Sequence, residues 1–193
     1  IRNGKYCSRQ ITEEFSNKYE YFSDNLNIEE YNKFHTNVLK NLLRVSNLIF
    51  YNIQIVTGSK KSIFKMIGDF SEFLKDVVIW DKGSCEPSIG EGIINKRTEL
   101  ILIFTKKNSI SRKFETAKFE RGFLNDIWNI PVNKIKTEKH KAVFPKKLVK
   151  KILENFTLEN DIIYDPFMGT GTTGIVAKNM NRKYVGSEIC KEY

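Results

Sequence analysis

Hydrophobic and polar residues follow one another along the chain in blocks that predict helices and strands in turn. Over residues 28–45, apolar side chains recur at spacings of three and four, which predicts a helix with one buried face. Asn27 and Glu30 have the spacing of a helix N-cap and its reciprocal partner. Residues 47–53 form a nearly continuous apolar run, and such runs are typical of strands that are covered on both faces.

The same succession of helix and strand is repeated further along the chain. A second helical pattern runs from Ile63 to Leu74, and the apolar runs 77–80 and 99–105 predict strands. The glycine-containing stretch 82–96 between these two runs predicts a loop. Strands separated by helices favour an α/β fold with a doubly wound, mainly parallel sheet.

The last part of the chain predicts a helix followed by a strand, a turn, a helix and a strand. Pro145 suits the first turn of a helix whose apolar stripe ends at Phe156. The short apolar run 161–164 predicts a strand, and residues 183–189 predict a second one. A glycine-rich turn and a helical pattern lie between them, which together form a strand, turn, helix and strand unit.

The glycine-rich turn predicts a ligand site at the N-terminus of the helix that follows it. Gly169 and Gly171 tolerate unusual backbone angles and let a ligand lie against the main chain. Glu188, near the end of the next predicted strand, offers a carboxylate to the hydroxyls of a ribose. Residues 169–174 read G-T-G-T-T-G, a pattern that on its own indicates a dinucleotide.

A longer string favours a different cofactor. Residues 165–173 read D-P-F-M-G-T-G-T-T, and residues 182–188 read R-K-Y-V-G-S-E. Together they closely resemble the S-adenosylmethionine motif of DNA amino-methyltransferases. The resemblance implies that the turn holds the methionine and adenosine portions and that Glu188 binds the ribose hydroxyls. The cofactor-binding residues that it implies in this region are Asp165, Phe167, Gly169, Thr170, Gly171, Thr172 and Glu188. Alternatively, Asp165 is a strand-end residue that hydrogen-bonds its own turn.

A second segment carries the same resemblance. Residues 140–145 read H-K-A-V-F-P and resemble the HPAPFP segment that comes just before the glycine-rich motif in this family. The resemblance implies that Ala142, Val143 and Phe144 support the methionine end of the cofactor. Lys141 stands where the family usually has proline, so we assign no side-chain role to His140.

Residues 106–139 differ in character from the rest. Lysine and arginine outnumber the acidic residues there, and phenylalanine and tryptophan are interleaved with them. The pattern fits a DNA-facing insertion in which basic side chains contact phosphates. Alternatively, the aromatic residues form a small core beneath a solvated basic loop. The residues predicted to bind DNA are Lys106, Lys107, Arg112, Lys113, Lys118 and Arg121.

The order of these segments resembles the permuted β class of N4-cytosine or N6-adenine DNA methyltransferases. That resemblance implies one Rossmann-like, circularly permuted sheet divided into three parts. Residues 1–105 would form the catalytic-side half, 106–139 the target-recognition insertion and 140–193 the cofactor-binding half.

One motif of that family does not occur in this sequence. In the family, a (D/S)PP(Y/F) tetrapeptide receives the exocyclic amine of a base that is flipped out of the duplex. Arg2-Asn3-Gly4 resembles the residues that follow this tetrapeptide. We therefore expect the motif immediately before Ile1, in a longer enzyme of which this chain is a portion, and we assign no catalytic residue.

Composition and charge restrict the kinds of partner that the protein is expected to bind. The net charge of +9 and the pI near 9.3 favour a polyanion, either nucleic acid or an anionic membrane. No apolar run is long enough to span a bilayer, and the first residues do not resemble a signal peptide. Three separated cysteines and two histidines predict no metal site and a reducing compartment. Of the histidines, His35 reads as a surface or boundary residue of its helix.

The sequence therefore predicts a site-specific DNA methyltransferase that transfers a methyl group from S-adenosylmethionine to the N6 of adenine or the N4 of cytosine. We expect it to act in a restriction-modification system in the cytoplasm of a prokaryotic cell. Expected partners are double-stranded DNA and a restriction endonuclease or specificity subunit, with oligomerisation left open and no membrane. Alternatives are a non-catalytic subunit or a fragment completed by another chain, an RNA substrate and, more remotely, an NAD-dependent oxidoreductase.

Overall fold

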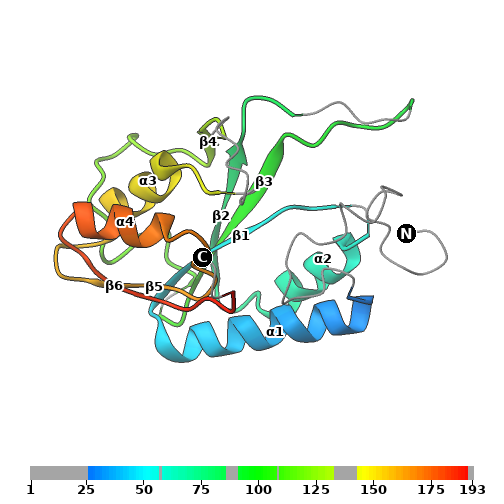
Figure 1. The fold of residues 1–193 in the computed structure, drawn as a ribbon, viewed down its shortest axis with the longest axis horizontal. Helices are drawn as coiled ribbons and strands as arrows, with labels where there is room; N and C mark the ends of the chain where they lie inside the picture. Colours follow the sequence, from blue (N-terminus) through cyan, green and yellow to red (C-terminus); the bar gives the residue numbers. More distant parts are fainter. Residues whose placement is uncertain (1–25, 57, 86–90, 108, 133–142, 191–193) are drawn as a thin grey trace. The chain divides into compact units, whose positions relative to one another are not determined.

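The computed structural model of the protein (Figure 1) describes residues 26–56, 58–85, 91–107, 109–132 and 143–190. The chain divides into two compact units. The first unit contains residues 1–79 and 99–112, and the second contains 80–98 and 113–193. These boundaries differ from the three-part division expected from the sequence, which remains a prediction.

Two helices belong to the first unit. α1 spans Ile28–Val45 and α2 spans Lys60–Asp69. The predicted cap of α1 is confirmed, because Asn27 Oδ1 accepts the Glu30 amide at 2.9 Å and Glu30 Oε2 accepts the Asn27 amide at 3.0 Å. α2 ends earlier than the apolar pattern predicted, because the chain turns after Asp69 instead of continuing the helix.

Four strands form a sheet with the order β1-β3-β2-β4. Their bounds are Leu48–Ile53 for β1, Leu74–Asp81 for β2, Thr98–Thr105 for β3 and Ile127–Asn129 for β4. β1 and β3 are antiparallel, with Leu48 opposite Thr105 and Ile53 opposite Leu100. The expectation of a mainly parallel sheet is wrong for this pair. An apolar run has the same pattern in a parallel and in an antiparallel strand, so the sequence did not determine the direction of this pair.

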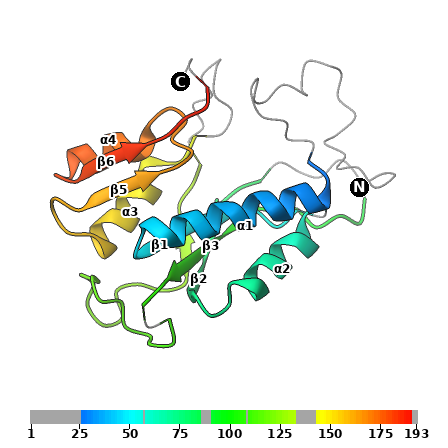
Figure 2. The ribbon, with the colours of Figure 1, turned by 90° about the horizontal axis from the view of Figure 1, so that it is seen from below.

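The core of the first unit lies between the two helices and one face of the sheet (Figure 2). It consists of Leu39, Leu42, Leu43, Ile49, Tyr51, Ile53, Ile63, Met66, Phe70, Leu102 and Phe104. His35, which we read as a surface or boundary residue, is half-buried on α1, and its Nδ1 bonds to the hydroxyl of Tyr51. Burial lowers the pKa of His35 to about 4, so the imidazole is neutral at physiological pH.

The second unit contains the predicted unit of helix, strand, turn, helix and strand. Its elements are α3 (Lys146–Phe156), β5 (Ile162–Asp165), α4 (Thr172–Asn179) and β6 (Lys183–Gly186). β5 and β6 pair in parallel, and Asp165 is the partner of Gly186 in the ladder. β6 is shorter than the predicted strand 183–189, so Glu188 follows the strand. The two helices pack together on Ile163 and Tyr184 of the two strands.

Three aromatic side chains of the basic stretch pack within the second unit. The rings of Phe114 and Phe119 lie 5.0 and 5.4 Å from the ring of Phe156 on α3. Trp128 is buried, and the ammonium of Lys151 lies 5.1 Å from its ring centroid. For these three aromatic residues, the small-core alternative is confirmed, whereas Phe123 is exposed.

Candidate functional site

The glycine turn joins the end of β5 to the start of α4. Gly169 and Gly171 have positive φ angles of 48° and 74°, conformations that glycine adopts without a steric penalty. Among the residues that the structure describes, no heavy atom lies within 4 Å of a Cβ added to either glycine. These residues therefore leave space over the turn, as a ligand that lies against the main chain requires.

Parallel pairing of β5 and β6 brings the residues after β6 to this turn. Ser187 donates its amide to the carbonyl of Asp165 at 3.0 Å, and Met168 donates its amide to the carbonyl of Ser187 at 3.0 Å. These two bonds continue the ladder past the end of the strands. They place the side chain of Glu188 beside the glycine turn, as the sequence predicted for neighbouring strand ends.

Both carboxylate oxygens of Glu188 accept hydrogen bonds from main-chain amides. Oε2 accepts from Gly169 at 2.8 Å, and Oε1 accepts from Ile189 and from Cys190, each at 2.9 Å. Bonds of this kind are stronger than those between neutral groups, because the acceptor is charged. Glu188 thus presents a fixed negative charge at the edge of the open turn.

Asp165 is bonded within its own turn. Its Oδ1 accepts the amide of Phe167 at 3.1 Å, and its Oδ2 accepts the hydroxyl of Thr173 at 2.6 Å. The carboxylate therefore ties the last residue of β5 to the turn and to the first turn of α4. Thr173 was not among the site residues predicted from the sequence. The signal that could have indicated it is a hydroxyl side chain eight residues after an aspartate at a strand end.

The third glycine of the G-T-G-T-T-G pattern has a packing role. A Cβ added to Gly174 would come 2.5 Å from the ring of Tyr184, so only glycine fits between α4 and β6 at this point. The hydroxyl of Tyr184 is buried and has no hydrogen-bond partner among the described residues. Burial and then the charge of Asp165 raise the pKa of Tyr184.

The remaining predicted cofactor residues differ in their exposure. Thr170 and Phe167 are exposed, whereas Thr172, the first residue of α4, is buried. Val143 is half-buried, and the exposed ring of Phe144 lies 6.2 Å from that of Trp80. Ala142 lies outside the described residues. Among the described contacts, none joins Val143 or Phe144 to the glycine turn.

The six predicted DNA-binding side chains are all exposed, and they belong to both units. Lys106, Lys107 and Arg112 are part of the first unit, where the Lys106 ammonium lies 3.4 Å from the carbonyl of Arg44. The other three, Lys113, Lys118 and Arg121, are part of the second.

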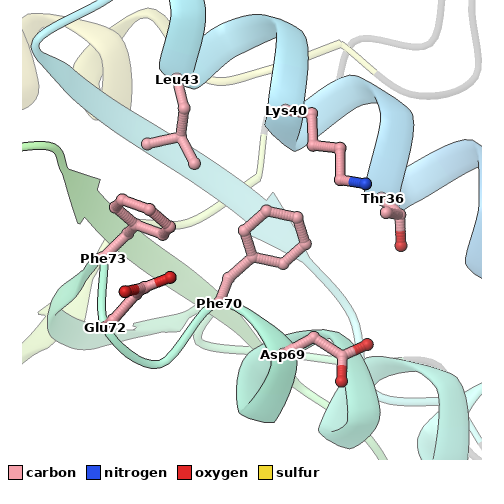
Figure 3. Close-up of a pocket in the computed structure, with 7 residues that line it drawn as sticks. All are labelled: Thr36, Lys40, Leu43, Asp69, Phe70, Glu72 and Phe73. Atoms are coloured by element: carbon pink, nitrogen blue, oxygen red, sulfur yellow. The ribbon is translucent and has the colours of Figure 1, made fainter.

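A separate pocket of about 520 Å³ lies in the first unit, between α1 and the end of α2 (Figure 3). Its apolar side chains are Leu43, Phe70 and Phe73, and its polar ones are Thr36, Lys40, Asp69 and Glu72. None of the residues selected from the sequence lines it.

The described residues contain neither a candidate metal site nor a membrane-spanning helix. No cluster of histidine, cysteine, aspartate or glutamate suited to a metal ion occurs in that part of the chain. Within the same residues, every helix is too short or too polar to cross a membrane.

Comparison with known proteins relates the chain to DNA-modifying enzymes. The family model N6_N4_Mtase, described as DNA methylase, matches residues 10–193. The type II methyltransferase M2.LlaDCHI of Lactococcus lactis subsp. cremoris is 34% identical over 125 residues, which cover 60% of this chain and 46% of that protein. The chain spans about half the length of the curated relatives it matches.

Two solved structures are similar in fold. The cytosine-N4-specific PvuII DNA methyltransferase has a TM-score of 0.69 at 20% identity, covering 87% of this chain and 69% of that one. The crystal structure of the M1.HpyAVI-SAM complex has a TM-score of 0.54 at 30% identity, covering 76% of this chain and 69% of that one. Both are consistent with a Rossmann-like α/β methyltransferase fold. Since the family model covers nearly the whole sequence, the chain belongs to the N6/N4 DNA methylase family.

Proposed function

We propose that this chain is the cofactor-binding and DNA-binding part of an enzyme that methylates the exocyclic amine of adenine or cytosine in DNA. The observation that carries the proposal is the glycine turn, which is open above Gly169 and Gly171 and has the Glu188 carboxylate at its edge. A nucleoside cofactor needs both features, because its ribose hydroxyls require an acceptor and its body must lie close to the main chain. Membership in the family and the bound cofactor named for the M1.HpyAVI complex support S-adenosylmethionine as that cofactor.

Each residue at the turn has a separate task in this proposal. Glu188 accepts hydrogen bonds from the ribose hydroxyls. The main chain of Gly169, Thr170 and Gly171 lies against the bound nucleoside. Thr172, at the start of α4, and the exposed ring of Phe167 complete the lining. Asp165 shapes the cofactor cradle, because its two oxygens hold the amide of Phe167 and the hydroxyl of Thr173. Ala142, Val143 and Phe144 are proposed to support the methionine end, on the strength of the sequence resemblance.

The chemistry needs positioning more than acid or base catalysis. When bound, S-adenosylmethionine supplies an electrophilic sulfonium methyl group. The task of this chain is to hold that methyl group in line with the nitrogen of the base and to keep the geometry fixed during transfer. The groups that receive the amine are proposed to come from a (D/S)PP(Y/F) segment outside these 193 residues, in the order of the permuted β class.

DNA is the proposed polyanion partner. The exposed side chains of Lys106, Lys107, Arg112, Lys113, Lys118 and Arg121 supply positive charge for its phosphates, and the net charge of +9 supports the same partner. The type II methyltransferases of Lactococcus lactis and Streptococcus pneumoniae support a role in a restriction-modification system. We propose an endonuclease or specificity subunit as the further partner and the cytoplasm as the site of action.

The second candidate is a non-catalytic subunit that binds cofactor and DNA, while another chain supplies the (D/S)PP(Y/F) tetrapeptide that these 193 residues do not contain. The test is to incubate the polypeptide that carries this sequence with unmethylated duplex DNA and S-adenosylmethionine, then analyse the nucleosides by mass spectrometry. We expect N6-methyladenine or N4-methylcytosine. Cofactor binding without either product would support the non-catalytic subunit, and methylation of structured RNA in preference to DNA would contradict the proposed substrate.

A further inference from the structure

We propose that Glu188 is also a positioning residue, which fixes the conformation of the glycine turn before any cofactor binds. The part of this inference that concerns ligand affinity rests on the proposed function. The part that concerns the empty protein depends only on the contacts of the carboxylate.

The glycine turn is tied down at two amides by two acidic side chains. Asp165, at the end of β5, accepts the amide of Phe167 at 3.1 Å, and Glu188, after β6, accepts the amide of Gly169 at 2.8 Å. Gly169 has a positive φ of 48° and open space around its α carbon. No side chain of the described residues packs at that carbon to hold Gly169 in place, so the bond to Glu188 is well placed to do so.

The other oxygen of Glu188 fixes the acidic side chain itself. Oε1 accepts the amides of Ile189 and Cys190, each at 2.9 Å, and these two bonds restrict the rotation of the side chain. With Oε1 anchored in this way, Oε2 is directed at the turn. The arrangement explains why a residue outside the turn can determine where the turn lies.

The number of acceptor sites on the carboxylate connects this role to cofactor binding. A carboxylate offers about four lone-pair sites, and three amides occupy three of them here. The site that remains is on Oε2, the oxygen that already holds Gly169. A ribose hydroxyl can therefore bond to Oε2 while Gly169 stays in place, so that one oxygen holds both the turn and the ribose.

Substitution of Glu188 by glutamine tests the role in the empty protein. Glutamine has nearly the same size but only one acceptor oxygen, so its NH₂ group must face either Gly169 or the amides of Ile189 and Cys190. We expect hydrogen exchange of the Gly169 amide, measured by NMR without ligand, to become about tenfold faster or more. Glu188→Asp, which keeps the charge but shortens the side chain, should have the same effect and serves if the glutamine variant does not fold.

Glu154→Gln is the matched control, because Glu154 lies in the same unit, on the exposed face of α3, and pairs with Lys150 at 3.2 Å. This substitution changes the net charge by the same amount as Glu188→Gln and should leave the hydrogen exchange of the Gly169 amide unchanged. An unaltered exchange rate for Gly169 in both variants of Glu188 would overturn the positioning role.

A second measurement separates positioning from ribose binding. The wild-type protein and Glu188→Gln are titrated with S-adenosylhomocysteine and with its 2′,3′-dideoxy analogue, which lacks the ribose hydroxyls. If Glu188 acted only on the hydroxyls, the substitution would not change the affinity for the analogue, and that result contradicts the inference. We expect the variant to lose about tenfold in affinity for the analogue as well. If the wild type binds neither compound, the proposed function fails, and amide exchange alone decides the role of Glu188.

Discussion

The Oε2 atom of Glu188 lies 2.8 Å from the amide nitrogen of Gly169, a residue nineteen positions earlier in the chain. The contact joins the segment after β6 to the turn after β5. It depends on the parallel register of the two strands, in which Asp165 is opposite Gly186. Since parallel strands end at the same edge of a sheet, an acidic residue two positions after β6 reaches the turn after β5.

The bond between Thr173 and Asp165 gives the first prediction. Asp165→Ala removes a charged acceptor from the Phe167 amide and the Thr173 hydroxyl, and we expect it to lower the free energy of unfolding by about 2 kcal/mol. Thr173→Val removes only the hydroxyl and should cost about 1 kcal/mol. Urea denaturation of both single variants and the double variant measures the coupling between them. Fully additive effects would show that the 2.6 Å contact does not contribute to stability.

Gly174 gives a prediction about packing. Gly174→Ala places a methyl group 2.5 Å from the ring of Tyr184, and we expect the free energy of unfolding to fall by about 1–3 kcal/mol because α4 must move from β6. Gly68→Ala in α2 is the control, since its Cβ meets nothing within 4 Å. It should stabilise the protein by about 0.5–1 kcal/mol, because alanine has a higher helix propensity than glycine. Equal effects of the two substitutions would contradict the packing role.

The sequence predicted the elements whose signals are local. Asn27 and Glu30 marked the start of α1, and the glycine-rich turn between two apolar runs marked β5, the turn and α4. Each of these signals depends on neighbouring residues only, because capping and turn conformation are set within a few positions.

The sequence did not predict features that depend on partners far along the chain. The antiparallel pairing of β1 with β3 could not be read from the apolar runs, since a covered strand has the same pattern in either direction. From the sequence, Gly174 was interpreted as part of a ligand motif. In the structure, glycine is required at this position because a Cβ would collide with the ring of Tyr184. The hydrogen bonds of Glu188 to main-chain amides likewise could not be predicted from the sequence. The bond of Asp165 to its own turn confirms an alternative that the sequence had offered.

His35 gives a prediction about pH. Burial lowers the pKa of His35 in the folded protein to about 4 from an ordinary value of 6.5, so between these values the unfolded chain binds more protons than the folded one. Stability should therefore fall as the pH decreases from about 6.5 to about 4, by on the order of 2 kcal/mol after allowance for partial exposure. Urea denaturation between pH 7 and pH 4.5 measures this slope, which is the change in the free energy of unfolding per pH unit.

His35→Gln isolates the contribution of the imidazole. Glutamine does not titrate, so the slope in this pH range should become flatter while other ionisable groups are unchanged. A variant with the slope of the wild type would show that a different group causes the loss of stability.

The exposed basic residues give a prediction about DNA. If Lys118 and Arg121 contact phosphates, replacing each with glutamine should weaken duplex binding for all sequences and reduce the salt dependence of the binding constant by about one unit per contact. Fluorescence anisotropy at several salt concentrations measures both quantities. Lys65→Gln is the control, because Lys65 pairs with Asp69 at 2.6 Å and was not selected for DNA binding. A salt slope that is unchanged in the Lys118 and Arg121 variants would remove these residues from the DNA interface.

The central claim is that the glycine turn between Asp165 and Thr172 binds S-adenosylmethionine. Isothermal titration calorimetry of the protein with S-adenosylmethionine and, separately, with NAD measures it most directly. We predict saturable binding of S-adenosylmethionine with one site per chain, lost or strongly weakened in Glu188→Ala, and no binding of NAD. Saturable binding of NAD with no heat from S-adenosylmethionine would contradict the account.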